Sequence, residues 1–324
     1  MKENRPTRHV LRWISYVIVG VAALYFLREL HRRTADIPPI AWGPQAITAL
    51  LFGILAVAAT ALLIGAIWHL LLRDQAQPLP LSKAIQIVAI SQIGKYLPGN
   101  VGHFAGRAVL AREAGVPIGI TASTLLIETA WTLAIGAGFS AMAFIFYLDS
   151  GTSSQFTSLG LLEFVLATLF LLALPWAGIQ LVNRLAPGLS RRVGGGQLVS
   201  PPKAVTALTV SALMVFCFLL LGASLKLQAE WFFQLQEVPW LPLTCLFTAA
   251  WLVGYVVPGA PGGLGVREAM MVVLLSPLVG PGVAVGLGLS MRLVSVGGDG
   301  LAFLIGVLSR RWPRHLSGDH DANQ

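Results

Sequence analysis

Two apolar stretches of the chain are interrupted near their centres by proline and glycine, at Leu97-Pro98-Gly99-Asn100 and at Val257-Pro258-Gly259-Ala260-Pro261-Gly262-Gly263. The stretches run over Ala84–Arg112 and Leu241–Pro277. Proline removes a backbone donor and glycine frees φ, so each cluster ends a helix. Each arm is about 20 to 25 Å of helix, shorter than the hydrocarbon of a bilayer. We therefore predict two re-entrant helical hairpins, with a pair of kinked full spans as the alternative.

Six further segments are long and apolar enough to cross a membrane, because a span needs about 20 mostly apolar residues. With approximate ends they are Val10–Leu27, Gln45–Leu72, Pro117–Leu148, Leu159–Val182, Ala204–Leu225 and Val283–Leu308. Basic residues precede the first segment, as in a signal peptide. No small-residue cleavage site lies before Arg28, so we expect an uncleaved anchor. The sequence predicts a single all-α polytopic membrane domain with about six spanning helices and two re-entrant hairpins.

The composition of the 324-residue chain favours this fold class and excludes others. Apolar residues make up 56% of the chain and charged residues 11%. An ordinary soluble domain carries about a quarter charged residues. So few charges exclude an ordinary cytosolic enzyme, a disordered chain and a nucleic-acid-binding protein. The two cysteines, Cys217 and Cys245, lie in apolar stretches and indicate neither a disulfide framework nor a metal site, and we expect no cofactor.

The net charge of +8 comes from basic residues that gather on one predicted side of the membrane. With the N-terminus in the cytoplasm, most Lys and Arg side chains fall inside or at the inner interface. The outer side receives Arg28, Arg32, Arg33 and Lys226. This distribution follows the positive-inside rule, with one awkward loop at 28–33. We therefore expect both termini in the cytoplasm, with 313–324 as a polar tail.

The two interrupted stretches repeat each other. When the sequence is shifted by 160 residues, the following pairs coincide: Gly94 with Gly254, Pro98 with Pro258, Gly99 with Gly259, Gly102 with Gly262, and Arg107 with Arg267. The next span repeats with an offset that is larger by about one helical turn, so Glu128 aligns with Arg292. An odd number of spans separates the hairpins, so the second enters from the opposite side. We predict an inverted repeat with halves at about 1–150 and 155–312, an architecture of secondary transporters.

Ionisable residues inside a membrane are candidate functional residues, because each is costly unless it is paired or hydrated. Arg267 begins the returning arm of the second hairpin, where helix N–H groups and the helix dipole add to its charge. We interpret this position as a seat for a phosphate group. Glu268 either orients Arg267 or faces a cationic head group. The alternative is a local salt bridge that stabilises the turn.

The first hairpin carries a second polar cluster. Lys95 lies before the break, Asn100 lies within it, and His103 and Arg107 share one helix face at i, i+4 spacing. The glycines of the break allow close backbone approach, so this cluster predicts the other half of a polar cavity. Alternatively, Arg107 extends along the lipid to the interface and His103 is a hydrogen-bonded packing residue. One histidine without a second ligand makes no metal site.

Glu128 and Arg292 occupy equivalent positions in the two halves and carry opposite charges. We predict that they form an ion pair across the cavity or lie within water-filled reach of each other. The alternative is that each contacts substrate separately. Asp299 adds to the polar path, while close helix packing best explains the glycines around it. The sequence contains no phosphate-binding loop of an ATPase and no nucleophile elbow.

The residues around the two breaks also resemble the signatures of a known family. The runs are Ser91-Gln-Ile-Gly-Lys-Tyr-Leu-Pro-Gly-Asn-Val-Gly-His103, ending near Arg107, and Val257-Pro-Gly-Ala-Pro-Gly-Gly-Leu-Gly-Val-Arg-Glu268. They are similar to the lysylphosphatidylglycerol synthase transmembrane-region family, which includes the flippase domain of the multiple peptide resistance factor. The resemblance covers roughly 10–312. It implies movement of a lipid between leaflets, such as an aminoacylated phosphatidylglycerol or a polyprenyl-linked sugar.

Together these features predict a lipid flippase or transporter of the bacterial inner membrane rather than an enzyme. Arg267, Arg107 and Lys95 would hold the phosphate of the head group while the lipid chains stay in the bilayer, and rocking of one half against the other would move access between leaflets. We expect no synthesis of the lysyl lipid, because the soluble aminoacyl-transferase domain of the two-domain relatives is lacking. Expected partners are the lipid substrate and the bilayer, and further a second copy of the chain or a lipid-synthesising enzyme, but no nucleic acid. The alternatives are a membrane-embedded lipid-modifying enzyme, or a small-ion channel or assembly partner.

Overall fold

The computed structural model describes residues 5–33, 35–40, 42–77, 79–97, 101–149 and 161–311, with side chains for all of these except 5–16, 18, 145–149, 161–172 and 310–311. In these ranges the regular secondary structure is helical. Five stretches with described side chains are long and apolar enough to cross a membrane, namely Pro44–Asp74, Ile118–Phe144, Ala204–Phe232, Pro261–Val279 and Pro281–Ser309. The protein is an all-α polytopic membrane protein.

The long helices follow the predicted spans. In chain order, the six predicted segments correspond to α1 (Arg5–Arg33), α2 (Pro44–Asp74), α5 (Ile118–Asp149), α6 (Leu161–Leu185), α8 (Ala204–Phe232) and α11 (Pro281–Arg311). A short helix, α7 (Pro187–Val193), follows α6. Proline begins α2 and α11, because the first turn of a helix leaves the N–H that proline lacks unpaired in any case.

The first interrupted stretch folds into two short helices that pack together. They are α3 (Leu81–Ser91), which continues into the 3-10 helix η1 (Gln92–Tyr96), and α4 (Gly102–Glu113). The predicted break residues Pro98, Gly99 and Asn100 lie outside the described residues. Beside the break, Gly94 and Gly102 pack backbone to backbone, since a Cβ on Gly94 would lie 2.6 Å from the carbonyl carbon of Gly102. Only glycine allows this approach.

The second interrupted stretch has the same organisation. It comprises α9 (Trp240–Val256), the 3-10 helix η2 (Pro261–Gly263) and α10 (Val266–Val279). The chain turns between α9 and α10 through residues with positive φ, among them Gly262 at 56° and Gly265 at 80°. The stretch from η2 to the end of α10 is long enough to count as a span, although we assigned it to a hairpin. The stretch counts as a span only if η2 and α10 are taken together. The turn at Gly265 divides them, and α10 alone has 14 residues, about 21 Å of helix.

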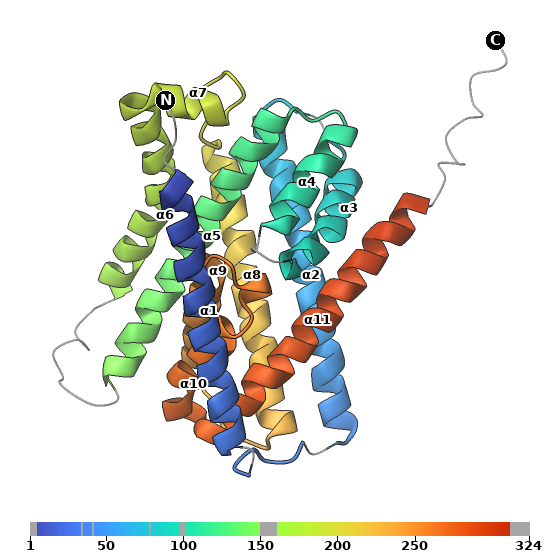
Figure 1. Cartoon of the computed structure of the whole chain (residues 1–324), viewed down its shortest axis with the longest axis vertical. Coiled ribbons are helices and arrows are strands. Elements are labelled where there is room, and N and C mark those ends of the chain that lie inside the picture. Colours follow the sequence, from blue (N-terminus) through green and yellow to red (C-terminus); the bar gives the residue numbers. More distant parts are fainter. Residues whose placement is uncertain are drawn as a thin grey trace.

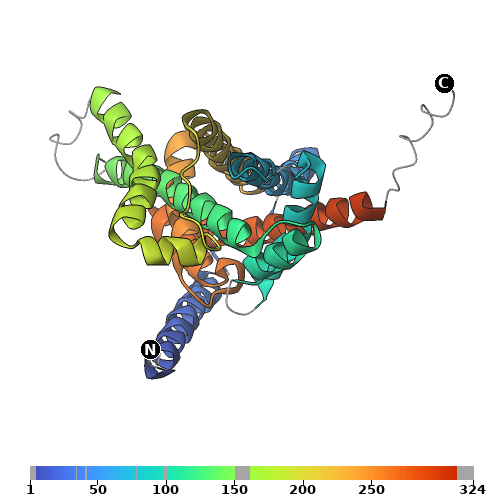
Figure 2. The ribbon, with the colours of Figure 1, turned by 90° about the horizontal axis from the view of Figure 1, so that it is seen from above.

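The two short-helix pairs lie at opposite ends of the bundle. In Figure 1, α3 and α4 occupy the upper half and α9 and α10 the lower half, and η1 contacts η2 where the pairs meet. The helix that follows each pair packs on the first arm of the other pair, because α5 contacts α9 and α11 contacts α3. Viewed from above, α1, α6 and the end of α11 reach outward from this centre (Figure 2).

The helices α2, α8 and α11 pack closely on one another at small residues. A Cβ on Gly53 would meet side-chain atoms of Ser224 and Val294 at 2.8 Å, and a Cβ on Gly298 would lie 2.5 Å from the Cβ of Val57. The prediction that the glycines near Asp299 allow close helix packing is confirmed at Gly298. The outward faces of these helices expose large apolar side chains, as expected of a surface that meets lipid.

Candidate functional site

A cavity of about 180 Å³ lies where the two short-helix pairs meet. Side chains of α2, α5, α8 and α11 complete its wall. Part of the wall is aromatic, with Phe218 from α8 and Phe247 and Trp251 from α9. Its charged members are Lys95, Arg107, Glu128, Arg267, Arg292 and Asp299. The cavity has room for several water molecules and combines an apolar surface with a concentration of charge.

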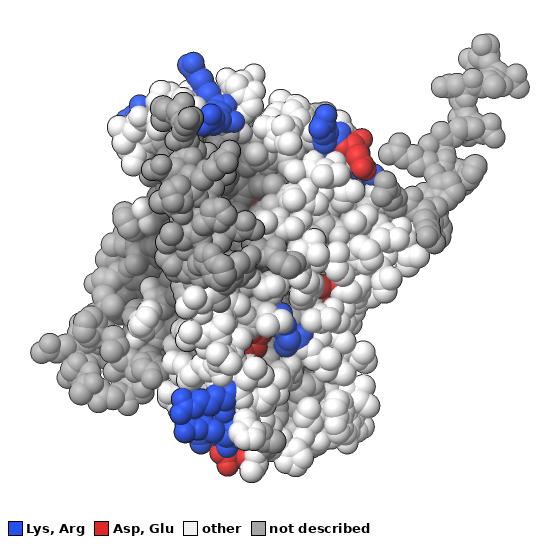
Figure 3. Space-filling view, in the orientation of Figure 1, with Lys and Arg blue, Asp and Glu red and all other residues white. Residues whose placement is uncertain are grey.

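The charged part of the cavity reaches the side of the bundle. The side chain of Lys95 is 26% exposed and that of Arg292 is 18% exposed, whereas that of Asp299 is only 2% exposed. Figure 3 shows blue and red atoms about halfway between the charged clusters at the two ends, surrounded on the described part of this face mainly by uncharged residues. Cationic and anionic groups are therefore held at mid-depth in the bundle, where an ionisable side chain is expensive unless it has a partner or a function.

Arg107 and Glu128 form a buried ion pair. The Nη1 atom of Arg107 lies 2.7 Å from Oε2 of Glu128, and the side chains are 2% and 11% exposed. The guanidinium also lies over the Trp68 ring, 5.5 Å from its centroid. The Nε atom of Arg107 has no hydrogen-bond partner among the described residues. Arg107 therefore does not extend to the interface, which was the alternative interpretation.

Glu268 holds the start of α10 and faces two arginines. Its Oε2 atom accepts a hydrogen bond of 2.7 Å from the backbone N–H of Gly265, as in a helix cap. Its Oε1 atom lies 3.4 Å from Nη2 of Arg267 and 3.5 Å from Nη1 of Arg292. One carboxylate is thus shared at long distance between two guanidinium groups. The local salt bridge that we considered as an alternative is present, but it is weak in geometry.

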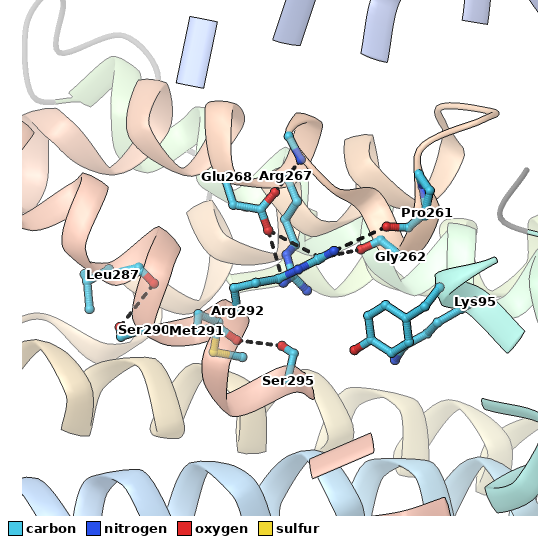
Figure 4. A network of polar contacts seen from close by, with 12 residues as sticks. Lys95, Pro261, Gly262, Arg267, Glu268, Leu287, Ser290, Met291, Arg292 and Ser295 are labelled. Atoms are coloured by element: carbon cyan, nitrogen blue, oxygen red, sulfur yellow. Dashed lines mark hydrogen bonds and ion pairs between the residues drawn. The ribbon is translucent and has the colours of Figure 1, made fainter. Parts of the chain in front are cut away.

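Arg292 is oriented by hydrogen bonds to backbone carbonyls, whereas part of the Arg267 guanidinium lacks a hydrogen-bond partner among the described residues. In Figure 4 the Arg292 side chain extends toward the η2 turn, where it donates to the carbonyl oxygens of Gly262 at 2.9 Å and Pro261 at 3.3 Å. Arg267 is buried, and its Nε atom has no hydrogen-bond partner among the described residues. Buried donors are normally paired. Arg267 therefore has donor capacity available beside the cavity.

Lys95, Tyr96 and Asp299 form a third polar group, which joins η1 to α11. Lys95 Nζ lies 2.7 Å from the Asp299 carboxylate, and the Tyr96 hydroxyl donates to its Oδ2 atom at 2.5 Å. The Tyr96 ring lies 5.7 Å from the Arg292 guanidinium carbon. The sequence interpretation included Lys95 and gave Asp299 a minor role, but it missed Tyr96. Its position beside Lys95, just before the Pro-Gly break, was the available signal.

His103 lies on the cavity wall next to these groups. Its ring is buried and lies 3.9 Å, centroid to centroid, from that of Phe104. Its Nδ1 atom has no hydrogen-bond partner among the described residues. The hydrogen-bonded packing role that we considered is therefore incomplete in this structure.

The structure brings most of the predicted site residues together. Seven of the eight predicted binding residues line the cavity or contact a residue that does, namely Lys95, His103, Arg107, Glu128, Arg267, Glu268 and Arg292. The eighth, Asn100, lies outside the described residues. A direct Glu128–Arg292 ion pair does not form, but both side chains line the same cavity. The other form of the prediction, that they lie within water-filled reach of each other, stays a prediction. Each has a partner in its own half of the chain, because Arg107 of α4 reaches Glu128 and Glu268 of α10 is the carboxylate nearest Arg292.

The charges of this site do not balance. Lys95, Arg107, Arg267 and Arg292 contribute four positive charges, and Glu128, Glu268 and Asp299 contribute three negative ones. Two of the cations, Lys95 and Arg107, each have a carboxylate at 2.7 Å. The excess therefore resides at Arg267 and Arg292, which share Glu268. An anionic group is the complement that this part of the cavity lacks.

Comparison with known proteins identifies one matching family model. The model described as the lysylphosphatidylglycerol synthase TM region matches residues 12–299, which include both short-helix pairs and every charged residue of the cavity. Among curated proteins, the comparison found no match. The match covers most of the chain and confirms the resemblance noted in the sequence.

Proposed function

Because the chain belongs to the lysylphosphatidylglycerol synthase transmembrane-region family, we propose that it is a lipid flippase. It moves an anionic or aminoacylated phospholipid, or a polyprenyl-linked lipid, between the leaflets of the membrane. The observation that carries this proposal is a buried cavity with an excess of positive charge at mid-depth in an apolar bundle. The cavity takes the polar head group, which would otherwise have to cross the hydrocarbon, while the lipid chains remain in the bilayer.

The proposed transport path runs between two re-entrant hairpins of an inverted repeat. Four features support this assignment. The short-helix pairs lie at opposite ends of the bundle (Figure 1). Their 3-10 turns meet, and the contacts of α5 with α9 match those of α11 with α3. In both pairs two glycines pack together across the break: Gly94 of η1 against Gly102, the first residue of α4, and Gly254 of α9 against Gly263 of η2.

Within the cavity, Arg267 is the first candidate to hold the phosphate of the head group. It has an unpaired buried donor, and it lies in the first turn of α10, where helix N–H groups favour an anion. Arg292 stands beside it. Lys95 and Arg107, which we expected to bind the phosphate as well, already have close carboxylates and contribute to the positive potential of the site. We propose no covalent chemistry, so the protein acts as a transporter.

The upper end of the bundle in Figure 1 is the cytoplasmic one in this proposal. It carries the ends of α2, α4 and α7, with basic residues that include Arg73, Arg112 and Arg191. The opposite end carries residues 28–33, which we expected to form a loop but which form the last turns of α1. There Arg33 is neutralised by Glu29 at 2.9 Å and Asp36 at 3.4 Å. These pairs offset positive charge on the outer side, as expected if both termini are cytoplasmic in an inner-membrane topology.

Leaflet-resolved lipid movement in proteoliposomes tests the function. The full chain is reconstituted with phosphatidylglycerol labelled on an acyl chain, and loss of the label from one leaflet is followed with a membrane-impermeant quencher. Arg267→Gln is compared with Arg112→Gln, an exposed arginine at the other pair. We expect the first variant to lower the initial rate about tenfold, the worth of one charge-assisted hydrogen bond, and the second to leave it unchanged.

Two results would contradict the proposal. One is wild-type protein that moves none of the anionic, aminoacylated or polyprenyl-linked lipids supplied to it. The other is an Arg267→Gln variant with the wild-type rate. Ion flux without lipid movement, measured in the same vesicles, would indicate a channel instead.

A further inference from the structure

Tyr96 contacts two groups of charged residues in the cavity, one that contains Lys95 and Asp299 and one that contains Arg267, Glu268 and Arg292. Its hydroxyl donates to Oδ2 of Asp299 at 2.5 Å, and its ring lies 5.7 Å from the guanidinium carbon of Arg292. It belongs to η1 of the first hairpin, whereas Asp299 and Arg292 both belong to α11. One side chain therefore contacts an acid and a base of the same helix from the opposite half of the protein.

Asp299 and Arg292 would otherwise attract each other. They are seven positions apart on α11, about two helical turns, so they lie on nearly the same face of the helix. Asp299 is 1% exposed, and charges in such surroundings interact strongly. An aspartate that turned toward Arg292 would neutralise one of the two arginines that face the cavity. In the structure Asp299 does not turn toward Arg292, because its carboxylate pairs with Lys95 and accepts a hydrogen bond from Tyr96.

Arg292 points instead to the η2 turn, and Tyr96 packs against that turn as well. Arg292 donates to the carbonyl oxygens of Pro261 and Gly262, as Figure 4 shows. A Cβ on Gly262 would lie 3.3 Å from the Tyr96 ring. The ring therefore borders the space in which the Arg292 guanidinium lies, and the hydroxyl holds the acid away from it.

We infer that Tyr96 is a positioning residue: by holding Asp299 on the first hairpin, it keeps Arg292 and Arg267 available for a phosphate ester of the transported lipid. This inference rests on the proposed function and names the chemistry of the ligand that these arginines take. Tyr96 itself contributes no charge to the ligand site. It acts on the ligand through Asp299, so its effect depends on the negative charge at position 299.

This dependence gives the experiment its design. Binding to the detergent-solubilised full chain is measured by calorimetry with dihexanoylphosphatidylglycerol. Dihexanoylglycerol, which lacks the phosphate, is the control ligand, and glycerol 1-phosphate tests for a free phosphate ester. The variants are Tyr96→Phe, Asp299→Asn and the double variant. Tyr25→Phe, at an exposed tyrosine of α1, is the matched control.

We expect Tyr96→Phe to weaken binding of the phosphate-containing lipid about tenfold, because Asp299 loses one of the two partners that hold it away from Arg292. Tyr25→Phe is expected to have no effect. Asp299→Asn should bind at least as tightly as wild type, and the double variant should return to within about threefold of wild type, because the acid at position 299 no longer competes for Arg292. A structural role for the Tyr96 hydroxyl would show no such rescue.

Three outcomes with the variants would overturn the inference, and so would one with the wild-type protein. They are unchanged affinity in Tyr96→Phe, a double variant as weak as the single one, and a tenfold loss in Asp299→Asn. Wild-type protein that binds dihexanoylglycerol as well as the phospholipid would also do so. The result is separable from the proposed function, because lipid movement by the wild-type protein is measured in proteoliposomes without reference to Tyr96. Tighter binding of glycerol 1-phosphate than of the lipid would assign the site to a free phosphate ester.

Discussion

Replacement of Glu128 by methionine should destabilise the protein severely, because it leaves the Arg107 charge buried without a partner. The two side chains are in contact at 2.7 Å and are 11% and 2% exposed. The other favourable contact of the guanidinium is with the Trp68 ring at 5.5 Å, and its Nε atom has no hydrogen-bond partner among the described residues. Breaking a buried ion pair on one side costs about 3–5 kcal/mol, at least a hundredfold change in the folding equilibrium.

The double variant Arg107→Met/Glu128→Met should be more stable than either single variant. Replacing both members of a buried pair by apolar groups is often close to neutral, since the desolvation cost of both charges disappears. The free energy of unfolding is measured for wild type, both singles and the double in mixed micelles, and the coupling energy is taken from the cycle. Hydrogen bonds between membrane helices average only about 0.6 kcal/mol. A coupling energy of that size, with additive single effects, would refute the buried-charge argument.

An exchange of charges separates the observed pairing from the one expected from the repeat. Arg107→Glu/Glu128→Arg keeps opposite charges in contact and should recover much of the stability lost in the singles. Glu128→Arg/Arg292→Glu should not recover it, because the carboxylate nearest Arg292 is Glu268 at 3.5 Å. Equal recovery in both exchanges would show that Glu128 and Arg292 interact directly in solution.

Two further predictions concern packing and topology. Gly298→Ala should lower the free energy of unfolding by about 1–3 kcal/mol, because its Cβ would overlap Val57. Gly300→Ala is the control and should change the stability little, because nothing lies within 4 Å of its Cβ. Thermal unfolding of both variants tests this, and equal stability of the two would contradict the packing. In a background without Cys217 and Cys245, cysteines at Arg33 and Arg112 should react with an impermeant thiol reagent from opposite sides of the membrane, the former from outside. Labelling of both from one side would contradict the orientation.

The sequence was sufficient for the helices and their interruptions because the signals for these are local. A stretch of apolar residues of sufficient length becomes a helix wherever it packs, and proline and glycine stop it. The cluster that begins at Val257 illustrates this, since α9 ends at Val256. The start of α10 could not be obtained in this way, because length and hydropathy do not show that Gly262 and Gly263 of η2 and Gly265 before α10 have positive φ.

The partners of the charged residues could not be obtained in the same way. Alignment of the two halves paired Glu128 with Arg292, but equivalence under a repeat relates positions and does not measure distance. Arg107, only 21 residues before Glu128, lies on the adjacent helix and reaches it. Tyr96 was overlooked for a related reason. A tyrosine near a helix end in a membrane protein is usually an interfacial residue, and its contact with Asp299 joins residues 203 positions apart.

The contacts of the cavity divide into two classes, and this division bears on the movement that the proposed lipid transport requires. In each half, the returning arm is tied to the following span by an arginine and a glutamate, with Arg107 to Glu128 in the first half and Glu268 to Arg292 in the second. These contacts persist if each half moves as a unit. The Lys95 and Tyr96 contacts to Asp299 join one half to the other. In the rocking motion that we propose, these contacts would have to break, and we expect Asp299 to face the head group when they do.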